Sequence, residues 1–433
     1  MDNTKLFALA KERGLDDLQI VSDTADSFTL VYFGGHVEKN ETSSLSTCTV
    51  SAVLNGQKAV FRVEDMDMPE EEIIASLYDS ASHMQNAELN EIFAGSDEYP
   101  QVECVRGDFH DIPIRDKVEL LASIERKIKE KEPRVVQIPE IEYMEAVTSR
   151  SIVNSRGLDI SKKNEYCAVF FELVASDGKE SKVGFKYEVK KNLSEIDVDE
   201  MIDKAIEEAV GMFGAAPVES GEYPVIIENT AMISLLGSFS GMFSGESQLK
   251  KISPIQGKLG QKVFSDSITI LDAPLKEDAL LREPFDDEGV ACYDKTVVEN
   301  GVFKTMLHDL KTAKAFGVPP TGNMFGGISM CNGYIKPGER TKEEMIASTE
   351  RGLLLTGFDG LHAGLNPISA DMSLKTEGYL IRDGKIERPV TLVVMAGNFL
   401  KMMNDVAEVG SDLKFRDTLG SPSIKFNSVS ISG

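Results

Sequence analysis

Hydrophobic residues recur with two different periods in the N-terminal part of the chain. Residues 3–13 and 116–131 carry apolar side chains every three or four positions, which predicts amphipathic helices. The runs SFTLVYFGG and CTVSAVL are rich in β-branched and aromatic residues, which predicts strands, and the Asn55-Gly56 pair after them favours a tight hairpin. Pro69 and three glutamates begin another helix, PEEEIIASLYDSASHM, because proline and acids suit a first helical turn.

Further along, strand-like runs become more frequent than helical ones. Three strands are predicted before a helix at residues 198–213, and the turn 176–178 is expected to join the last two; the strands are 134–154, 165–175 and 182–189. Small residues, proline and glycine in 214–224 indicate a domain boundary. Beyond it we expect a buried strand at 225–228, a Gly/Ser segment, and strands with hairpin turns at Asn300-Gly301 and Asp383-Gly384.

This order of elements predicts an α+β fold. Helices alternate with strands less regularly than in a doubly wound fold. We expect an N-terminal α/β part with mixed sheets and flanking helices, followed by a C-terminal domain of largely antiparallel strands. The expected units are 1–113, 114–220 and 221–433, the last being rich in β-structure.

Charge and composition exclude several classes of function. The 433 residues carry a net charge of −25, and their basic runs are short, which argues against direct nucleic-acid binding and against an anionic membrane surface. No apolar run reaches the roughly 20 residues that span a bilayer, and the N-terminus lacks the features of a signal peptide. The five cysteines form no CxxC pair and are expected as buried free thiols. These features predict a cytoplasmic protein.

Common catalytic motifs are absent from the sequence. No two of the five histidines are closer than 27 residues, HExxH is missing, and so are the glycine-rich phosphate loops. His362 drew attention because it lies in a glycine-rich stretch, although a structural role is the simpler interpretation. The acidic run Asp286-Asp287-Glu288-Gly289 lacks the alternating ligands of a calcium loop and is expected to form a turn or the start of a strand.

The Gly/Ser segment, residues 235–247 (LLGSFSGMFSGES), is the most unusual stretch. Gly237, Gly241 and Gly245 are four residues apart and would form one stripe if the segment were a continuous helix. Three glycines weaken a helix by about 1 kcal/mol each relative to alanine, so such a stripe needs a packing or functional reason. Ser247 and Lys250 also match the S-x-x-K pattern of some serine nucleophiles, but the companion motifs are missing.

Four long segments carry recognisable motifs: REPFDDEGVACYDKTVVENGVFKTMLHDLKTAKAFG, MAGNFLKMMNDVAEVGSDLKF, TLGSPSIKF and NSRGLDISKKNEY. They resemble segments of the TldD/PmbA family, also known as peptidase U62 or modulator of DNA gyrase, and the likeness extends over about residues 15–432. In the TldD-like branch of this family an HExxxH helix and a later cysteine bind zinc. Members of the PmbA (TldE-like) branch lack that motif and pair with the zinc subunit.

Placed on this chain, the zinc motif is degenerate. Its two histidine positions fall on Gly237 and Met242, and its glutamate position falls on Ser238. The resemblance implies that the ligand cysteine lies in the TLGSPS stretch, but residues 408–433 contain no cysteine. The resemblance therefore implies a PmbA-like chain with no catalytic residues and no metal site of its own, zinc being expected only in a TldD-like partner.

Three hypotheses follow from the sequence. The chain is a metal-free subunit of a peptidase that processes small unstructured polypeptides, such as peptide-antibiotic precursors and antitoxins; or a stand-alone homodimeric binding or scaffold protein; or an enzyme that uses Ser247 and Lys250. Its partner would be a TldD-like zinc subunit or a second copy. The residues expected to line a peptide cleft are Ser244, Gly245, Ser247, Lys250, Asp371, Ser373 and Asn398.

Overall fold

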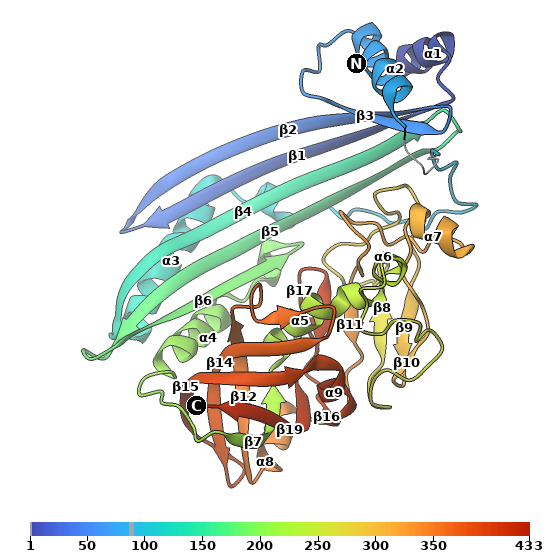
Figure 1. The fold of residues 1–433 in the computed structure, drawn as a ribbon. Helices are drawn as coiled ribbons and strands as arrows, with labels where there is room; N and C mark the ends of the chain where they lie inside the picture. Colours follow the sequence, from blue (N-terminus) through green and yellow to red (C-terminus); the bar gives the residue numbers. More distant parts are fainter. Residues whose placement is uncertain (1, 86–90) are drawn as a thin grey trace. The chain divides into compact units, whose positions relative to one another are not determined.

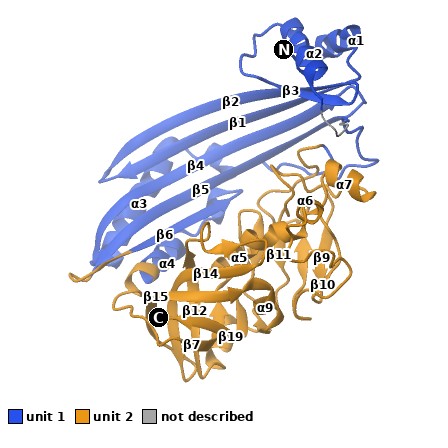
Figure 2. Cartoon of the chain, in the orientation of Figure 1, with its two compact units in different colours: residues 1–176, 183–207, 289–291 blue, residues 177–182, 208–288, 292–433 orange. Residues whose placement is uncertain are grey.

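The computed structural model describes residues 2–85 and 91–433. The chain divides into two compact units (Figure 2). Unit 1 comprises residues 1–176, 183–207 and 289–291, and unit 2 comprises residues 177–182, 208–288 and 292–433. The helices and the combination of parallel and antiparallel strand pairs confirm the predicted α+β class.

Unit 1 contains one six-stranded sheet with the order β3-β2-β1-β4-β5-β6 (Figure 1). The pairs β2–β3, β1–β2, β1–β4 and β4–β5 are antiparallel. Stretches 1–113 and 114–220 thus both contribute strands to this sheet. The strands are β1 (Asp17–Phe33), β2 (His36–Leu54), β3 (Gln57–Val63), β4 (Val135–Asn154), β5 (Asp159–Ser176) and β6 (Ser181–Lys190).

The hairpin between β2 and β3 forms at the predicted place. Asn55 and Gly56 have φ angles of 52° and 74°, the left-handed conformation that a two-residue hairpin turn requires and that glycine adopts without strain. Only Cys48–Leu54 of β2 pair with β3. Residues 36–47 of β2 therefore form a free edge of the sheet among the described residues, and most of their side chains are exposed.

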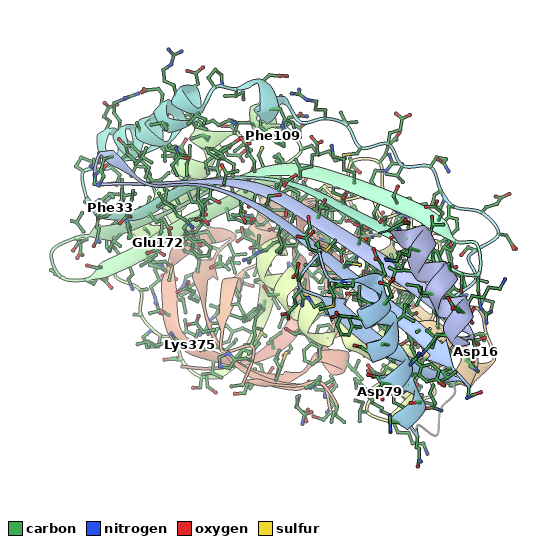
Figure 3. All side chains as sticks on the ribbon, turned by 90° about the horizontal axis from the view of Figure 1, so that it is seen from above. Asp16, Phe33, Asp79, Phe109, Glu172 and Lys375 are labelled. Atoms are coloured by element: carbon green, nitrogen blue, oxygen red, sulfur yellow. The ribbon has the colours of Figure 1, made fainter. Side chains whose placement is uncertain are left out.

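Two groups of helices cover different parts of this sheet. Leu6 of α1 and Leu77 of α2 share one core with Val50 of β2, and α3 packs along β4 and β1. Seen from above, the labelled Asp16 and Phe33 mark the two ends of β1, and Asp79 of α2 lies at the Asp16 end (Figure 3). The helices are α1 (Asn3–Arg13), α2 (Glu70–His83), η1 (Asp108–Asp111), α3 (Ile114–Lys131), η2 (Leu193–Glu195) and α4 (Val198–Val210).

Unit 2 contains a larger sheet with the order β12-β7-β19-β15-β14-β13, in which β16 also pairs with β19. β12 pairs with β7 in parallel. β12 also pairs with β14, so the strands β12, β7, β19, β15 and β14 form a closed ring. β19 lies between β7 and β15. The strands are β7 (Gly221–Ile227), β12 (Arg351–Asp359), β13 (Leu365–Asn366), β14 (Asp371–Arg382), β15 (Lys385–Asn398), β16 (Val406–Val409) and β19 (Ile424–Ser432).

A second sheet of unit 2 has the order β10-β9-β8-β11-β18-β17. The predicted turn at Asn300-Gly301 joins β9 to β10, and the one at Asp383-Gly384 joins β14 to β15 in the larger sheet. The strands of the second sheet are β8 (Ile270–Asp272), β9 (Lys295–Glu299), β10 (Val302–Phe303), β11 (Gly333–Ile335), β17 (Lys414–Arg416) and β18 (Leu419–Ser421).

Several predicted boundaries were wrong by a few residues. β5 begins at Asp159 rather than at 165, α4 ends at Val210 rather than at 213, and β7 begins at Gly221, inside the expected linker. The helices of unit 2 are α5 (Asn229–Phe239), η3 (Ser240–Phe243), α6 (Gly245–Leu249), α7 (Leu310–Phe316), α8 (Lys342–Ala347) and α9 (Phe399–Asn404). Within residues 2–85 and 91–433, no helix is both long enough and apolar enough to cross a bilayer.

Candidate functional site

The Gly/Ser segment is not one helix. α5 ends at Phe239, a single 3-10 turn follows, and Ser244 is extended, with φ −78° and ψ 142°, before α6 begins at Gly245. Ser244 causes this break, because its Oγ accepts the backbone N–H of Ser247 at 3.1 Å and so caps α6. The glycine stripe inferred from a continuous helix was therefore wrong.

The three glycines instead meet different surroundings. A Cβ at Gly237 would lie 3.2 Å from Leu419 Cδ1, and one at Gly241 would have nothing within 4 Å. A Cβ at Gly245 would lie only 2.5 Å from Nδ1 of His308. Gly245 is thus a point of close approach between α6 and the chain before α7, whereas Gly241 has no such packing role.

A row of aromatic rings holds this segment on the core of unit 2. Phe239 at the end of α5 stacks on Phe399, the first residue of α9, with centroids 4.4 Å apart. Phe264 lies edge-on to Phe399 at 6.2 Å and to Phe243 of η3 at 6.3 Å. Offset and edge-to-face rings are favourable geometries, and these rings are buried. The break between α5 and α6 therefore lies on a packed support.

The positions of the degenerate zinc motif all lie on this segment. Ser238 Oγ donates a hydrogen bond back to the carbonyl of Ser234 at 2.8 Å. Met242 is 3% exposed and belongs to the main hydrophobic core of unit 2. Gly237 faces Leu419, which belongs to the TLGSPS stretch where the resemblance places the missing cysteine. The structure thus brings together the two segments that the resemblance paired.

We tested whether these residues could hold zinc. Zinc in proteins takes thiolate, imidazole and carboxylate ligands, and Gly237, Ser238 and Met242 provide none of these. Across residues 2–85 and 91–433, no three His, Cys, Asp or Glu side chains are grouped so that they could hold a metal ion. The residues at the motif positions therefore do not fit the family's zinc ion.

The N-terminal end of α5 is tied to the same TLGSPS stretch by polar contacts. The backbone N–H of Asn229 donates to Ser423 Oγ at 3.1 Å, and Ser423 Oγ donates to Asp412 Oδ2 at 2.7 Å. The side-chain amide of Asn229 donates to the Asp412 backbone carbonyl at 3.0 Å. Ser423 is fully buried, so this network fixes α5 against the chain that precedes β19.

The first group of predicted cleft residues lies around α6. Ser244 is 5% exposed, and its Oγ lies 2.9 Å from the carbonyl of Gly241 and 3.0 Å from Ser247 Oγ. Gly245 donates its N–H to the carbonyl of Leu307 at 2.7 Å. The Lys250 ammonium is exposed and pairs with Glu246 at 2.6 Å. A lysine that activates a serine must be desolvated, so this environment does not suit Lys250 as a base for Ser247.

The second group lies where β14 and β15 meet. The side-chain amide of Asn398 donates to Asp371 Oδ1 at 2.9 Å, and Asn398 caps α9. Hydrogen bonds from Asn398, and then from Ser369, lower the pKa of the Asp371 carboxyl. Ser373 is exposed two residues further along β14. Asn398 directly precedes Phe399, so the Phe239–Phe399 stack connects this group to the end of α5.

His308 lies beside the Gly/Ser segment but was not predicted as a site residue from the sequence. It is 5% exposed, its Nδ1 lies 3.1 Å from Thr312 Oγ1, and burial lowers its pKa while Asp309 opposes that effect. Its neighbour Asp309 is the N-cap of α7, a signal that could have placed His308 at the start of that helix. His362, which drew attention in the sequence, is exposed on a turn.

The acidic run forms the turn that was predicted, and its carboxylates hold neighbouring loops. Asp286, which is fully buried, accepts the backbone N–H of Met324 at 3.0 Å. Asp287 accepts the N–H of Gly326 at 2.7 Å. Glu288 accepts the N–H of Leu310 at 2.7 Å, at the start of α7. These acids therefore organise backbone in unit 2.

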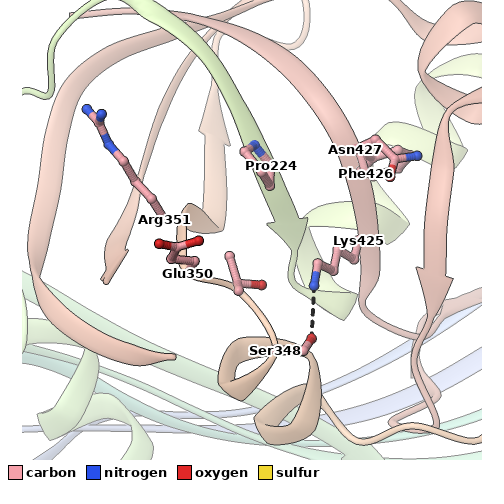
Figure 4. A pocket seen from close by; sticks show the side chains of 8 residues that line it. Pro224, Ser348, Glu350, Arg351, Lys425, Phe426 and Asn427 are labelled. Atoms are coloured by element: carbon pink, nitrogen blue, oxygen red, sulfur yellow. Dashed lines mark hydrogen bonds between the residues drawn. The ribbon is translucent and has the colours of Figure 1, made fainter. Parts of the chain in front are cut away.

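Unit 2 also has a surface pocket of about 320 Å³, which the acidic run 286–288 does not line (Figure 4). Lys425 Nζ donates to Ser348 Oγ at 3.0 Å on one side of it, and Arg351 lies on the other side. The predicted cleft residues do not line this pocket, which is formed by Pro224, Ser348, Thr349, Glu350, Arg351, Lys425, Phe426 and Asn427.

Comparison with known proteins places these features in a family. Residues 220–433 match the PmbA/TldA metallopeptidase C-terminal domain, and residues 107–213 match the central domain. A metalloprotease of Methanothermobacter thermautotrophicus is 29% identical over 326 residues, 70% of this chain and 68% of that protein. A metalloprotease PmbA homologue of Haemophilus influenzae is 24% identical over 436 residues, 99% of this chain and 91% of that protein.

Solved structures agree with this assignment. A Thermotoga maritima protein described as a modulator of DNA gyrase is 32% identical, with a TM-score of 0.91 and 99% of both chains covered. TldE from Thermococcus kodakarensis, at 24% identity and a TM-score of 0.89 over 99% of both chains, shares the fold. The chain therefore belongs to the PmbA/TldD metallopeptidase family.

Proposed function

We propose that this chain is a metal-free subunit of a PmbA/TldD-type peptidase complex that acts on small unstructured polypeptides. One observation carries the proposal: none of the residues at the positions of the zinc motif offers a zinc ligand. At Gly237 there is no side chain, and a Cβ there would already lie 3.2 Å from Leu419 Cδ1. Met242 is packed in the core at the second ligand position.

The surrounding residues suit a supporting role in substrate binding. Ser247 in α6, and Asp371 and Ser373 near the start of β14, present hydroxyl and carboxylate groups with which an extended peptide could form hydrogen bonds. Their positions are fixed by buried aromatic rings and by the Asn398 cap rather than by long loops. In this proposal the zinc subunit supplies the reacting groups and this chain supplies part of the wall of the cleft.

A partner surface is available in unit 1. The free edge of β2, residues 36–47, exposes backbone donors and acceptors together with Leu45, whose side chain is 57% exposed. Long free edges readily pair with another chain, and proteins usually shorten, charge or cover them. We place the contact with the partner on this edge.

Mixing this chain with a TldD-like relative that carries HExxxH tests the proposal. We expect light scattering to detect a complex, and we expect the complex to cleave a fluorescein-labelled unstructured polypeptide. This chain alone should neither retain zinc in elemental analysis nor cleave the probe. Failure to form a complex with several such relatives, or zinc-dependent cleavage by this chain alone, would refute it.

A stand-alone homodimer is the alternative that the β2 edge also supports. In that case light scattering would give the mass of two identical chains, and the zinc subunit would not displace one of them. Lys250→Ala tests the third hypothesis, in which Lys250 activates Ser247 as a nucleophile. Lys250 pairs with Glu246 instead, which argues against that role. We expect this variant to leave the activity of the complex unchanged.

A further inference from the structure

A buried carboxylate in unit 2 contacts both a primary amine and a primary amide. Asp272 ends β8 and Lys295 begins β9; Asp272 Oδ2 and Lys295 Nζ are 3.0 Å apart, and the two side chains are 0% and 3% exposed. The same Oδ2 accepts a hydrogen bond from Nδ2 of Asn323 at 2.7 Å, and Asn323 is fully buried. The other carboxylate oxygen accepts the N–H of Cys331 at 2.7 Å.

The amide of Asn323 is held by its nitrogen alone. Nδ2 also donates to the carbonyl of Ser329 at 2.9 Å, whereas Oδ1 has no hydrogen-bond partner in the described part of the chain. Buried side-chain oxygens nearly always have a partner, so this carbonyl needs an explanation. A purely structural ion pair between Asp272 and Lys295 does not provide one, because Asn323 Oδ1 takes no part in that pair.

We propose that Lys295 and Asn323 join in an intramolecular isopeptide bond, with Asp272 moving the proton between them. Asp272 first takes a proton from the Lys295 ammonium, which leaves a neutral amine. The Nζ lone pair then attacks Cγ of Asn323, the Nζ–Cγ bond forms, and the Cγ–Nδ2 bond breaks. A proton from Nζ passes through the carboxyl group to Nδ2, and ammonia leaves. The first proton remains on Asp272, whose O–H can then donate to the carbonyl oxygen of the new amide. No oxidant or other reactant is consumed.

The contacts of Asp272 suit the proton transfers, and both reacting side chains meet at this carboxylate. A single oxygen of Asp272 is hydrogen-bonded to the nitrogen that must lose protons and to the nitrogen that must gain one. Burial raises the pKa of the Asp272 carboxyl, which favours its taking up a proton, and the Lys295 ammonium opposes this effect. The ring of Tyr293, whose centroid is 4.4 Å from Nζ, restricts the movement of Lys295.

The bond would link β9 covalently to the segment between α7 and β11. The Asp272 carboxylate already organises that segment through Asn323 and Cys331, so the cross-link would make permanent an arrangement now held by hydrogen bonds. Covalent loop closure stabilises a fold mainly by restricting its unfolded state.

Mass spectrometry of the purified full-length chain tests this proposal. We expect the intact protein to be lighter than its sequence by one ammonia. A tryptic digest should give a branched peptide that joins the segment around Lys295 to the segment around Asn323, with no cleavage after Lys295. Lys295→Met and Asp272→Asn should each have the full mass calculated from their sequences and yield no branched peptide.

Two controls separate the bond from other losses of ammonia. Succinimides at the Asn-Gly pairs 55–56, 300–301 and 332–333 also lose ammonia, but hydroxylamine cleaves the chain there and leaves an isopeptide intact. Lys117→Met removes another buried lysine, whose partner Glu145 is shared with the hydroxyl of Tyr143 instead of an amide, and should keep the mass deficit. A wild-type chain of full mass with a normal tryptic cut after Lys295 would overturn the proposal, whatever the stability of the variants.

Discussion

Phe239 and Phe399 stack with their ring centroids 4.4 Å apart and their planes 17° from parallel. One ring is the last residue of α5 and the other is the first residue of α9. This contact joins the place of the family's zinc helix to the Asp371–Asn398 pair at the meeting point of β14 and β15. The stack is one of several ring contacts that hold these two parts of unit 2 together.

Phe239→Ala should destabilise unit 2. Both rings are at most 2% exposed, and removing a buried phenyl group usually costs about 3–5 kcal/mol because of lost burial and the cavity left behind. Urea unfolding followed by circular dichroism measures the loss. Leu259→Ala is the matched control, since Leu259 is 48% exposed in the same unit and should change stability by less than about 0.5 kcal/mol. Equal effects of the two substitutions would contradict the packing role of the stack.

Gly245→Ala should be harmful, whereas Gly241→Ala should be tolerated. A Cβ at Gly245 would lie 2.5 Å from His308 Nδ1 and 2.9 Å from Thr312 Cβ, so α6 and α7 must move apart, at a cost of about 1–3 kcal/mol. At Gly241 the added methyl group meets nothing within 4 Å. Thermal unfolding of the two variants compares these effects directly. A similar melting temperature for both would show that α6 and α7 can separate freely.

Leu45→Lys should weaken association with the partner chain. It places a charge on the free edge of β2, where the proposed contact would bury it, and an unpaired charge in an interface costs several kcal/mol. We expect the dissociation constant, measured by light scattering over a concentration series, to rise at least about tenfold. Val136→Lys places the same charge on β4, at a side chain that is 64% exposed, and should leave association unchanged. A larger effect at Val136 would move the contact away from the β2 edge.

Burial of His308 predicts a loss of stability in mild acid. Because its pKa is lowered from the usual 6.5, the unfolded chain takes up a proton first as the pH falls. Stability is therefore complete above about pH 6.5 and declines below it, by at most about 1.4 kcal/mol per pH unit, until the folded-state pKa is reached. His308→Gln should remove this part of the pH dependence in urea unfolding between pH 7.5 and 5. His362→Gln, at an exposed position, should behave like the wild type.

Local chemistry predicted part of this fold correctly. Asn55-Gly56 and Asn300-Gly301 gave two hairpins at the expected places, because the left-handed backbone of such a turn depends on the turn residues themselves. Helix α1 was predicted with its observed ends, since its cap and its apolar periodicity are both local. The start of β5 was missed because five of the six residues in Asp159–Asn164 are polar, and they pair with β4 through the backbone.

Features that depend on distant parts of the chain were not predictable in this way. The glycine stripe failed because Ser244 caps a new helix, a choice that the spacing of glycines does not reveal. The contact of Gly237 with Leu419, and the meeting of Asp272 with Lys295 and Asn323, join residues far apart in the sequence. Only the resemblance to the family pointed to the first of these contacts, and nothing in the sequence pointed to the second.

The place of β19 in the larger sheet of unit 2 bears on how the chain is made. β7 ends at Ile227, but its antiparallel neighbour β19 begins only at Ile424 and also bridges to β15. During synthesis every other strand of that sheet leaves the ribosome before β19. The strands β7, β12, β14 and β15 pair in that order, and β19 closes the ring between β7 and β15. Pairing over such long separations is slow, and unpaired strand edges are prone to aggregate. Until β19 emerges, the edges of β7 and β15 that will pair with it have no partner strand, and shielding by chaperones matters most at that stage.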